Sequence, residues 1–190
     1  MASKQDRVLR QQSGFTLWLT GLSGAGKSTI ANAVAERLRR HKIPVEILDG
    51  HEVRLNLSKG LGFSREDRDT NVRRIGYVAK LLTRNGVAVI PAAISPFRSV
   101  RDEVRRDIGA FVEVHVHATL DECVRRDTKG LYKKALAGEI PQFTGVSDPY
   151  EAPEKPELVV NTEQEDVEAS ADRVIDRLIE LGYLRNGTDA

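Results

Sequence analysis

A glycine-rich stretch at residues 21–29 carries the most specific chemical signal in the sequence. It spells GLSGAGKST and fits the pattern G-x-x-x-x-G-K-[ST]. Glycines let the backbone curl so that successive N–H groups point at phosphate oxygens, and the positive end of the following helix adds to this attraction. The pattern therefore predicts a nucleoside-triphosphate site formed by Gly21, Leu22, Ser23, Gly24, Ala25, Gly26, Lys27, Ser28 and Thr29.

Two side chains of this stretch are expected to do chemistry. Lys27 would bridge the β- and γ-phosphates as a catalytic cation, and Ser28 would ligate Mg²⁺. The alternative is a glycine-rich turn that contains a Lys-Ser pair by chance. An apolar, strand-like run at 15–20 precedes the stretch and a helical pattern follows it, and this context favours the nucleotide site.

A second candidate is the run ILDGH at residues 47–51, where an apolar segment ends at Asp49. The carboxyl ends of parallel strands share one edge of a sheet, so Asp49 and His51 are expected opposite the γ-phosphate. Either could act on an acceptor hydroxyl, and Asp49 could also hold the metal with Ser28. The alternative is that Asp49 only caps the next short helix and His51 is a solvated loop residue.

Five apolar runs, which alternate with longer helical patterns, must position these residues. Alternation of this kind indicates βαβ units and a mainly parallel sheet. We therefore expect an α/β fold of the P-loop NTPase type, three layers deep (α/β/α), with a five-stranded sheet and a lid segment. The runs lie at 15–20, 44–48, 87–94, 111–117 and 157–161.

Hydroxyl and acidic residues three positions apart predict where three helices begin. The pairs are Ser64 with Asp67, Thr119 with Glu122, and Thr162 with Glu165. After Ser64, apolar residues recur at three-to-four spacing as far as Leu82, and Asn85-Gly86 is a typical helix stop. The proline-rich stretch that follows residue 129 has the length and composition of a mobile functional flap.

The composition fits one soluble domain. The chain has 190 residues, 40% of them hydrophobic, and a formal charge of +1, which gives no general reason to expect nucleic acid or a membrane as partner. Its single cysteine, Cys123, favours a reducing compartment such as the cytoplasm. We expect flexible tails at 1–13 and 185–190, and a kinase domain at 14–184 with its lid at about 129–153.

The remaining motifs narrow the class of enzyme. No Asn-Lys-x-Asp guanine motif occurs, and the run at 87–94 lacks the Mg²⁺-binding aspartate of motor ATPases. A carboxylate after the second strand instead suits a kinase of small metabolites. Arginines gather downstream, and such a cluster indicates a second anionic ligand, although any one of them could lie on a solvated helix face. They are Arg54, Arg68, Arg73, Arg74 and Arg101.

Taken together, these stretches closely resemble the adenylyl-sulfate kinase family. The resemblance runs through GLSGAGKST, LDG, SKGLGFSREDRDTNVRRI, AAISP, RDTKGLYKKALAGEI and FTGVSDPYEAPEKPELVV. It implies transfer of the γ-phosphoryl group of ATP to the 3′-hydroxyl of adenosine 5′-phosphosulfate (APS), with Mg²⁺. The product, 3′-phosphoadenosine 5′-phosphosulfate (PAPS), is activated sulfate.

The resemblance also implies roles for individual residues. Phe63 and Phe143 match the aromatic pair that holds the APS adenine, and Arg126 with Lys129 matches the hinge of the flap over ATP. Ser95 matches a serine described in some members as a phosphoserine intermediate. The implied acceptor-binding set is Asp49, Arg54, Phe63, Arg68, Asn71, Ile94, Ser95, Lys129 and Phe143.

The chain departs from this family at one catalytic position. Most members have Asp-Gly-Asp where this chain has Asp49, Gly50 and His51, and the second aspartate is the usual candidate for orienting or deprotonating the hydroxyl. Either His51 takes that role, or Asp49 and the metal suffice. A His51 base predicts that the rate falls below a pH of about 6.5.

Other interpretations stay open at this point. The His51 change could accompany another nucleotide-linked acceptor, or the protein could be a nucleotide-binding regulator with weak catalysis. Glu113, His115 and His117 have a spacing that could ligate zinc, but without a fourth ligand nearby an ordinary strand face is favoured. The resemblance further implies a homodimer, and a separate ATP sulfurylase is a possible partner.

Overall fold

A five-stranded parallel sheet forms the centre of the computed structural model, which describes residues 8–127 and 129–187. The strand order is β3-β4-β2-β5-β6, and every neighbouring pair is parallel. The central strands β2 and β4 are buried along their whole length, as expected for near-continuous apolar runs. The strands are β2 (Phe15–Thr20), β3 (Val45–Asp49), β4 (Ala88–Ala92), β5 (Phe111–His117) and β6 (Leu158–Asn161).

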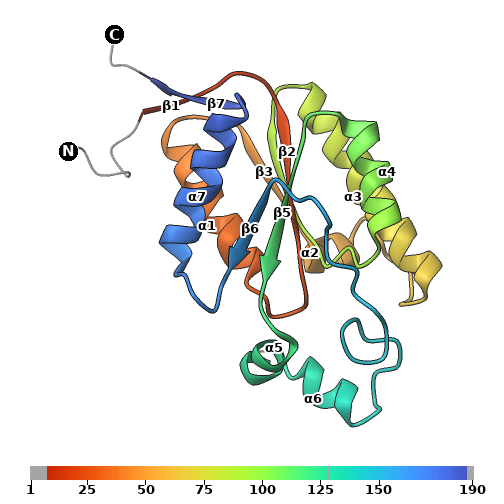
Figure 1. The fold of residues 1–190 in the computed structure, drawn as a ribbon. Coiled ribbons are helices and arrows are strands. Elements are labelled where there is room, and N and C mark those ends of the chain that lie inside the picture. Colours follow the sequence, from red (N-terminus) through yellow and green to blue (C-terminus); the bar gives the residue numbers. More distant parts are fainter. Residues whose placement is uncertain (1–7, 128, 188–190) are drawn as a thin grey trace.

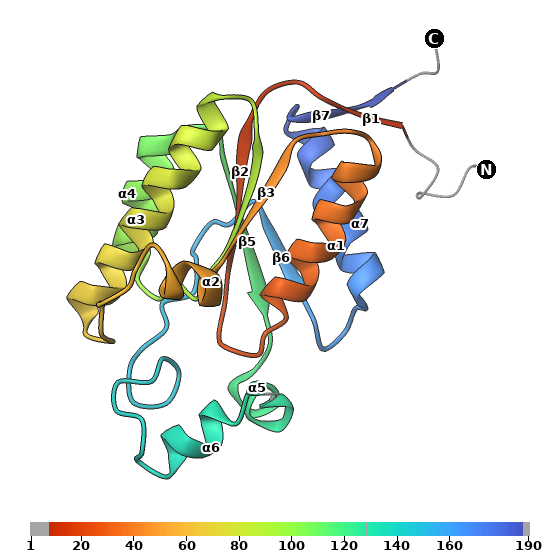
Figure 2. The same ribbon diagram turned by 180° about the vertical axis from the view of Figure 1, so that it is seen from behind.

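Helices cover both faces of this sheet (Figure 1), and the view from behind shows the same two layers (Figure 2). The helices α1 (Lys27–Arg40) and α7 (Val167–Glu180) pack on one face, and α3 (Arg65–Arg84) and α4 (Arg98–Ile108) on the other. One apolar core lies on the α1 and α7 side, and a second surrounds Trp18 on the α3 and α4 side. The expected α/β/α fold is confirmed.

Helix α3 illustrates how local sequence sets these elements. The Ser64 hydroxyl accepts a hydrogen bond from the Asp67 N–H at 3.1 Å, and the helix stops before Asn85 and Gly86, as predicted. Its buried stripe includes Val72 and Ile75. At Gly76, an added Cβ would lie 2.6 Å from Val104 of α4, so only glycine permits this close approach of the two helices.

The second of the three predicted helix starts is confirmed and the third is wrong. Helix α5 (Leu120–Arg126) begins after Thr119, whose hydroxyl accepts the Glu122 N–H at 3.2 Å. Helix α7 is capped by Asp166, because the Asp166 carboxylate accepts the Ala169 N–H at 2.7 Å. The Thr162 hydroxyl instead donates to the Ala25 carbonyl of the phosphate loop at 3.0 Å.

Two short helices lie at the carboxyl edge of the sheet. Helix α2 (Gly50–Leu55) follows β3 directly, and α6 (Leu131–Leu136) belongs to the 129–153 segment. That segment continues from α6 as irregular chain and projects beyond the sheet layers together with α5 (Figure 1). The sheet edge nearest to this segment is where all five parallel strands end.

The ends of the described chain pair with each other. Strand β1 (Val8–Gln11) runs antiparallel to β7 (Leu184–Gly187), so the tails expected at 1–13 and 185–190 contain ordered strands. Leu9 and Leu184 are both buried and join the core. Their burial stabilises this pair of strands, although the flanking sequence is polar. Residues 1–7 and 188–190 lie outside the described residues.

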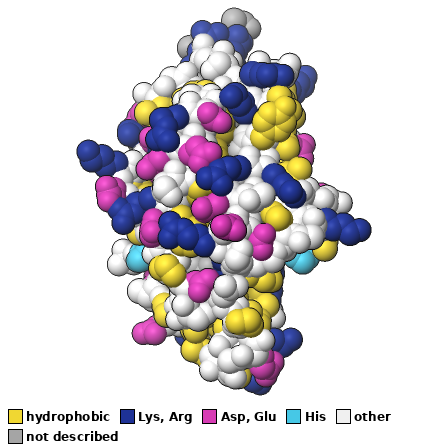
Figure 3. Space-filling model, turned by 90° about the vertical axis from the view of Figure 1, so that its right-hand side faces the viewer, with side chains coloured by type: hydrophobic (Ala, Val, Ile, Leu, Met, Phe, Trp, Pro, Cys, Tyr) yellow, Lys and Arg dark blue, Asp and Glu magenta, His cyan; other side chains and the backbone are white. Residues whose placement is uncertain are grey.

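The outer face over α3 and α4 carries basic and acidic side chains intermixed (Figure 3). Arg73 pairs with Glu103 on this face at 2.8 Å, and Arg98 pairs with Glu154. Such intermixing agrees with the near-neutral total charge and shows no single-sign surface for a polyanion on this side. Within the described residues, no helix has the length and apolar character needed to cross a membrane.

Candidate active site

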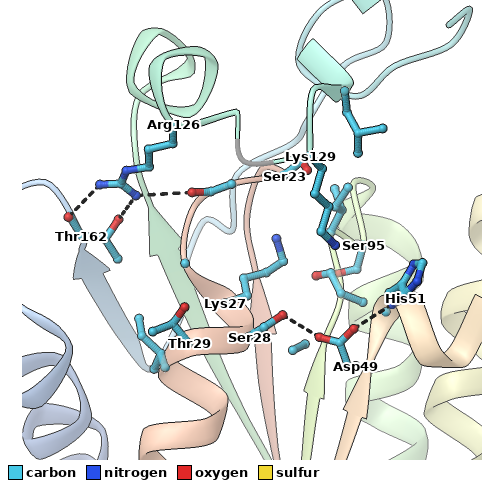
Figure 4. A pocket seen from close by; sticks show the side chains of 18 of the residues that line it. Ser23, Lys27, Ser28, Thr29, Asp49, His51, Ser95, Arg126, Lys129 and Thr162 are labelled. Carbon is cyan, nitrogen blue, oxygen red and sulfur yellow. Dashed lines mark hydrogen bonds between the residues drawn. The ribbon is translucent and has the colours of Figure 1, made fainter. Parts of the chain in front are cut away.

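A cleft of about 800 Å³ opens at the carboxyl edge of the sheet (Figure 4). Its volume is within the range of small-molecule sites. We call the wall formed by Gly21–Thr29 the phosphate-loop side, and the opposite wall, formed by Arg54, Phe63, Arg68 and Asn71, the arginine side. Asp49, His51 and the stretch Ala92–Pro96 lie between the two walls.

The phosphate-loop side has the backbone that the glycines were expected to provide. Gly24 and Gly26 have φ of 77° and 99°, a region that favours glycine, and Gly26 directly precedes α1. The Lys27 ammonium donates to the Gly21 and Leu22 carbonyls at 2.9 and 2.7 Å. Burial lowers the pKa of Lys27 to about 8. An anion in the loop would stabilise the charged form of this amine.

Asp49 faces the phosphate loop while it also caps α2. Its Oδ2 accepts the Ser28 hydroxyl at 2.5 Å, and its Oδ1 accepts the His51 N–H at 2.9 Å (Figure 4). Burial acts to raise the pKa of Asp49, but the hydrogen bonds from Ser28 and His51 outweigh it and hold the pKa below its ordinary value. The His51 side chain is exposed at the mouth of the cleft. Asp49, which was predicted to lie opposite the γ-phosphate, thus contacts Ser28 of the phosphate loop.

The oxygen atoms of Ser28 and Asp49 suit a hard divalent cation such as Mg²⁺. Mg²⁺ is usually held by one or two carboxylates together with phosphate oxygens and water, so it needs no larger protein cage. No group of three or more His, Cys, Asp or Glu side chains able to hold a metal occurs in the described part of the chain. Glu113, considered above as a zinc ligand, is instead paired with Arg101 at 2.8 Å and with Arg105 at 3.1 Å.

On the arginine side, two guanidiniums lie close to one aromatic ring. The guanidinium carbons of Arg54 and Arg68 lie 4.4 and 5.6 Å from the centroid of the Phe63 ring. Arg54 donates to the Leu61 and Gly62 carbonyls at 3.2 and 2.9 Å, which fixes its position. Burial lowers the pKa of both guanidiniums, and each stays a cation at neutral pH. This wall can attract an anionic ligand and offer it a ring face.

Asn71 and Arg68 differ in their hydrogen bonds. The Asn71 Oδ1 is buried and has no hydrogen-bond partner in the structure, so it is an acceptor available to a ligand or water in the cleft. Arg68 donates to the Phe63 carbonyl at 2.9 Å and to the Gln142 carbonyl in the 129–153 segment. The same arginine therefore holds both the wall and the segment above it.

The two phenylalanines expected to clasp a purine lie in different surroundings. Phe63 lines the cleft and is 50% exposed. Phe143 does not belong to the lining, and its half-buried ring packs edge-on against Tyr132 with 5.0 Å between centroids. The clasp stays a prediction for a bound state.

Ser95 lines the cleft, but its hydroxyl is bonded to groups inside the protein. The Ser95 Oγ accepts the Trp18 indole N–H at 3.0 Å and donates to the Thr20 hydroxyl at 3.0 Å, and the residue is 3% exposed. Its φ of 42° is uncommon for a residue other than glycine. This geometry favours a role in shaping the loop, and it offers no support for Ser95 as a phosphate acceptor. Its neighbour Ile94 also lines the cleft.

A buried ion pair beneath Ser95 was not anticipated as a support of the site. Arg101 donates to the Ser95 carbonyl at 2.6 Å, to Glu113 at 2.8 Å and to the Glu151 carbonyl at 2.7 Å. It is 2% exposed. Arg101 was assigned to an anion-binding cluster, but its three bonds direct it to the scaffold. Likewise, Arg73 and Arg74 do not line the cleft.

The roof of the cleft comes from the α5–α6 connection. Arg126 donates to the Thr162 hydroxyl and carbonyl, both at 2.9 Å, and to the Gly24 carbonyl at 3.4 Å. Lys129 extends toward the cleft above Lys27 and Asp49 (Figure 4). Of the two predicted hinge residues, Arg126 thus contacts the phosphate loop and Lys129 lines the cleft.

Several residues at the roof were missed or underestimated from sequence. Thr162 follows β6, so the rule that placed Asp49 at a strand end also applied to it, but the nearby Glu165 suggested a helix cap. Tyr132, a residue of the flap, was given no role in the site, and its hydroxyl donates to the Ser23 carbonyl at 2.9 Å. The first turn of α7 also reaches the cleft through Asp166, Val167 and Ser170, and no sequence pattern marked it.

Comparison with known proteins gives a consistent result. The family model described as Adenylylsulphate kinase matches residues 13–161. The adenylyl-sulfate kinase of a Picosynechococcus strain is 59% identical over 174 residues, which cover 92% of this chain and 98% of that protein. A probable bifunctional SAT/APS kinase of Sorangium cellulosum is 59% identical over 172 residues, which cover 90% of this chain and 30% of that protein.

A solved structure extends the similarity to three dimensions. The Mycobacterium tuberculosis APS kinase, determined in complex with AMPPNP and APS, superposes with a TM-score of 0.83 at 44% identity. The match covers 87% of this chain and 98% of that chain. The fold described above is therefore shared with an APS kinase whose structure contains AMPPNP and APS.

Proposed function

This chain belongs to the adenylylsulphate kinase family, and from that premise we propose that it transfers the γ-phosphoryl group of ATP to the 3′-hydroxyl of APS, giving PAPS and ADP. The observation that carries the proposal is the position of Asp49. Its carboxylate lies 2.5 Å from the Ser28 hydroxyl of the phosphate loop and faces the same cleft as the arginine side. The acceptor hydroxyl arrives in the space between the phosphate loop and the arginine side.

ATP binds on the phosphate-loop side. The backbone N–H groups of Gly21–Thr29 and the start of α1 hold its phosphates, and Lys27 leaves its two loop carbonyls to pair with the β- and γ-phosphates. Arg126, held by two bonds to Thr162, lies over the loop, and Lys129 extends toward the reacting groups. Positive charge on both sides of the γ-phosphate stabilises the charge that develops during transfer.

Ser28 and Asp49 would hold Mg²⁺, which would neutralise negative charge on the phosphate groups. Asp49 stays ionised at neutral pH, because its hydrogen bonds hold its pKa low. The hydroxyl proton passes to Asp49 or to the imidazole of His51, a residue whose backbone N–H donates to Asp49. Phosphoryl transfer depends mostly on positioning and charge neutralisation, so a histidine at position 51 is compatible with turnover.

APS binds on the arginine side. Arg54 and Arg68 attract its phosphosulfate, and the half-exposed Phe63 ring beside these guanidiniums offers a face for the adenine. Asn71 supplies an acceptor for a donor of the sugar or the base. Ile94 and Ser95 form the floor, and Phe143 reaches the adenine when the 129–153 segment closes.

The proposal is tested by ADP release from the purified protein with ATP and Mg²⁺, in the presence and absence of APS. We expect APS-dependent ADP release and a product heavier than APS by one phosphoryl group, measured by mass spectrometry. ADP release that ignores APS and responds to another nucleotide-linked compound would assign a different acceptor. Binding of ATP and APS without any product would indicate a regulatory protein.

The proposal includes a setting for this reaction. The chain acts in the cytoplasm in sulfate activation, assembles as a homodimer, and takes APS from a separate ATP sulfurylase. The joining of SAT and APS kinase in the name of the Sorangium relative supports the link between the two activities. Light scattering on the purified protein checks the dimer, for which a monomer mass would be the contrary result.

A further inference from the structure

Tyr132 connects the roof of the cleft to the phosphate loop. It is 1% exposed and belongs to the first turn of α6, yet its hydroxyl donates to the Ser23 carbonyl at 2.9 Å. The Asp127 carboxylate accepts the backbone N–H groups of Tyr132 and Lys133 at 3.1 and 3.0 Å, which fixes the start of the helix. Burial raises the pKa of Tyr132 well above its ordinary value, so the hydroxyl keeps its proton at neutral pH.

This bond sets the orientation of one peptide group in the phosphate loop. The peptide bond is planar and trans, so the Ser23 carbonyl and the Gly24 N–H point in opposite directions. When Tyr132 holds the carbonyl toward itself, the N–H is directed to the other side. Gly24 has a φ of 77° and, as a glycine, could rotate more freely than another residue. A fixed carbonyl therefore limits the freedom of an N–H that the phosphates need.

The ring of Tyr132 makes a second connection, toward the arginine side. It packs edge-on against Phe143, with 5.0 Å between centroids and 73° between planes. The residue before Phe143, Gln142, accepts a hydrogen bond from Arg68 of the arginine side. A continuous set of contacts thus runs from Ser23 through Tyr132 to Phe143 and Arg68, and it joins the two walls of the cleft above the reacting groups.

We propose that Tyr132 is a positioning residue with two separable parts. Its hydroxyl orients the Ser23–Gly24 peptide for the nucleotide phosphates, and its ring holds Phe143 for the acceptor. The inference rests on the proposed function for the acceptor part only. The nucleotide part needs no APS and can be tested on binding alone, so the failure of one can be distinguished from the failure of the other.

The experiment compares Tyr132→Phe with Tyr132→Leu. Tyr132→Phe keeps the ring and should weaken AMPPNP binding about fivefold in calorimetry, as for one lost hydrogen bond, while the KM for APS changes by less than about twofold. Tyr132→Leu also removes the contact with Phe143, so it should raise the KM for APS by about fivefold or more. Thermal unfolding of each variant reports whether the fold is retained.

Tyr150→Phe is the matched control. Tyr150 belongs to the same 129–153 segment, but its hydroxyl bonds to the Thr20 hydroxyl at 3.0 Å and does not contact a loop carbonyl. Its AMPPNP affinity should therefore stay within about twofold of the unchanged protein. Unchanged AMPPNP affinity in Tyr132→Phe, or an equal loss in Tyr150→Phe, would overturn the nucleotide part. Equal KM values for APS in the two Tyr132 variants would overturn the acceptor part.

Discussion

The phosphate-loop side of the cleft comes from nine consecutive residues, whereas the arginine side is gathered from α2, α3 and the chain between them. On the first side, Gly21, Gly24 and Gly26 have positive φ angles, and these backbone angles determine where the neighbouring N–H groups point. On the second, Arg54 depends on the Leu61 and Gly62 carbonyls, and Arg68 depends on Gln142, 74 positions away in the sequence.

This contrast shows two ways of making a charged site rigid. A local turn is rigid because its backbone has few allowed conformations. A site assembled from distant segments is rigid only if buried polar groups fix every contributor, as Arg101 does for Ser95, Glu113 and Glu151. Changes on the first side should therefore affect chemistry directly, while changes on the second should also affect folding and the binding of one ligand.

The largest effect is expected for Lys27→Met on the phosphate-loop side. The methionine removes the only charge that the loop itself aims at the β- and γ-phosphates, so kcat should fall by about a thousandfold or more. The free energy of unfolding should change little, because the variant no longer buries an ammonium. Steady-state ADP release and urea unfolding check the two parts. A variant that retained about a tenth of the activity would contradict this role for Lys27.

The next largest effect is expected for Arg101→Met, which tests whether Arg101 supports the fold beneath the arginine side. Glu113 would lose its fully buried partner, so the free energy of unfolding should fall by about 3 kcal/mol in urea titrations. Arg105→Met is the control, because Arg105 shares Glu113 but contacts neither Ser95 nor Glu151. It should cost about 1 kcal/mol. Equal losses of unfolding free energy in the two variants would mean that the bonds of Arg101 to Ser95 and Glu151 add nothing to stability.

Arg68→Lys tests the arginine side itself. A lysine keeps the charge but cannot reach the Phe63 and Gln142 carbonyls with one planar fork, so the KM for APS should rise by about 10- to 100-fold. The KM for ATP should change by less than about twofold, because no contact of Arg68 reaches the phosphate loop. Initial rates at varied APS and varied ATP give both values. A parallel rise of the two would show that the walls are not independent.

The smallest effect is a pH dependence confined to the phosphate-loop side. Burial lowers the pKa of Lys27 to about 8, and bound phosphates favour its protonated form. Above that pH the free protein must take up a proton when ATP binds, so affinity should fall by about tenfold between pH 7 and pH 9. Calorimetry with MgATP in buffers of different ionisation enthalpy measures both affinity and uptake. An affinity for MgATP that stays constant over this pH range, without proton uptake, would rule out this role of Lys27.

The same contrast explains what could be predicted from sequence. The five strands of the central sheet, two helix starts and the phosphate loop follow from local patterns. The position of Asp49 follows from the rule that parallel strands end at one edge. Thr162 obeyed that rule too, but Glu165 three residues later imitated a helix cap. Only the three-dimensional arrangement shows the Thr162 hydroxyl bound to the Ala25 carbonyl.

Other parts of the site have no local signature. Arg101 looks like any arginine of an amphipathic helix, and its burial arises because Glu113 and the Glu151 carbonyl meet it from distant segments. Tyr132 is one tyrosine in a lysine-rich stretch, and its value depends on a carbonyl more than 100 residues earlier. The terminal strands were missed because each presents a single apolar residue to the core, Leu9 and Leu184.

The pairing of β1 with β7 has a practical consequence for attached polypeptides. This ribbon lies at the opposite end of the molecule from α5 and α6 (Figure 1). Any module fused beyond either strand, whether a purification tag or a second enzyme, would be tethered at the far pole and leave the mouth of the cleft unobstructed. Modules fused to both ends, by contrast, would lie close together, because β1 and β7 are paired, and would hinder each other sterically.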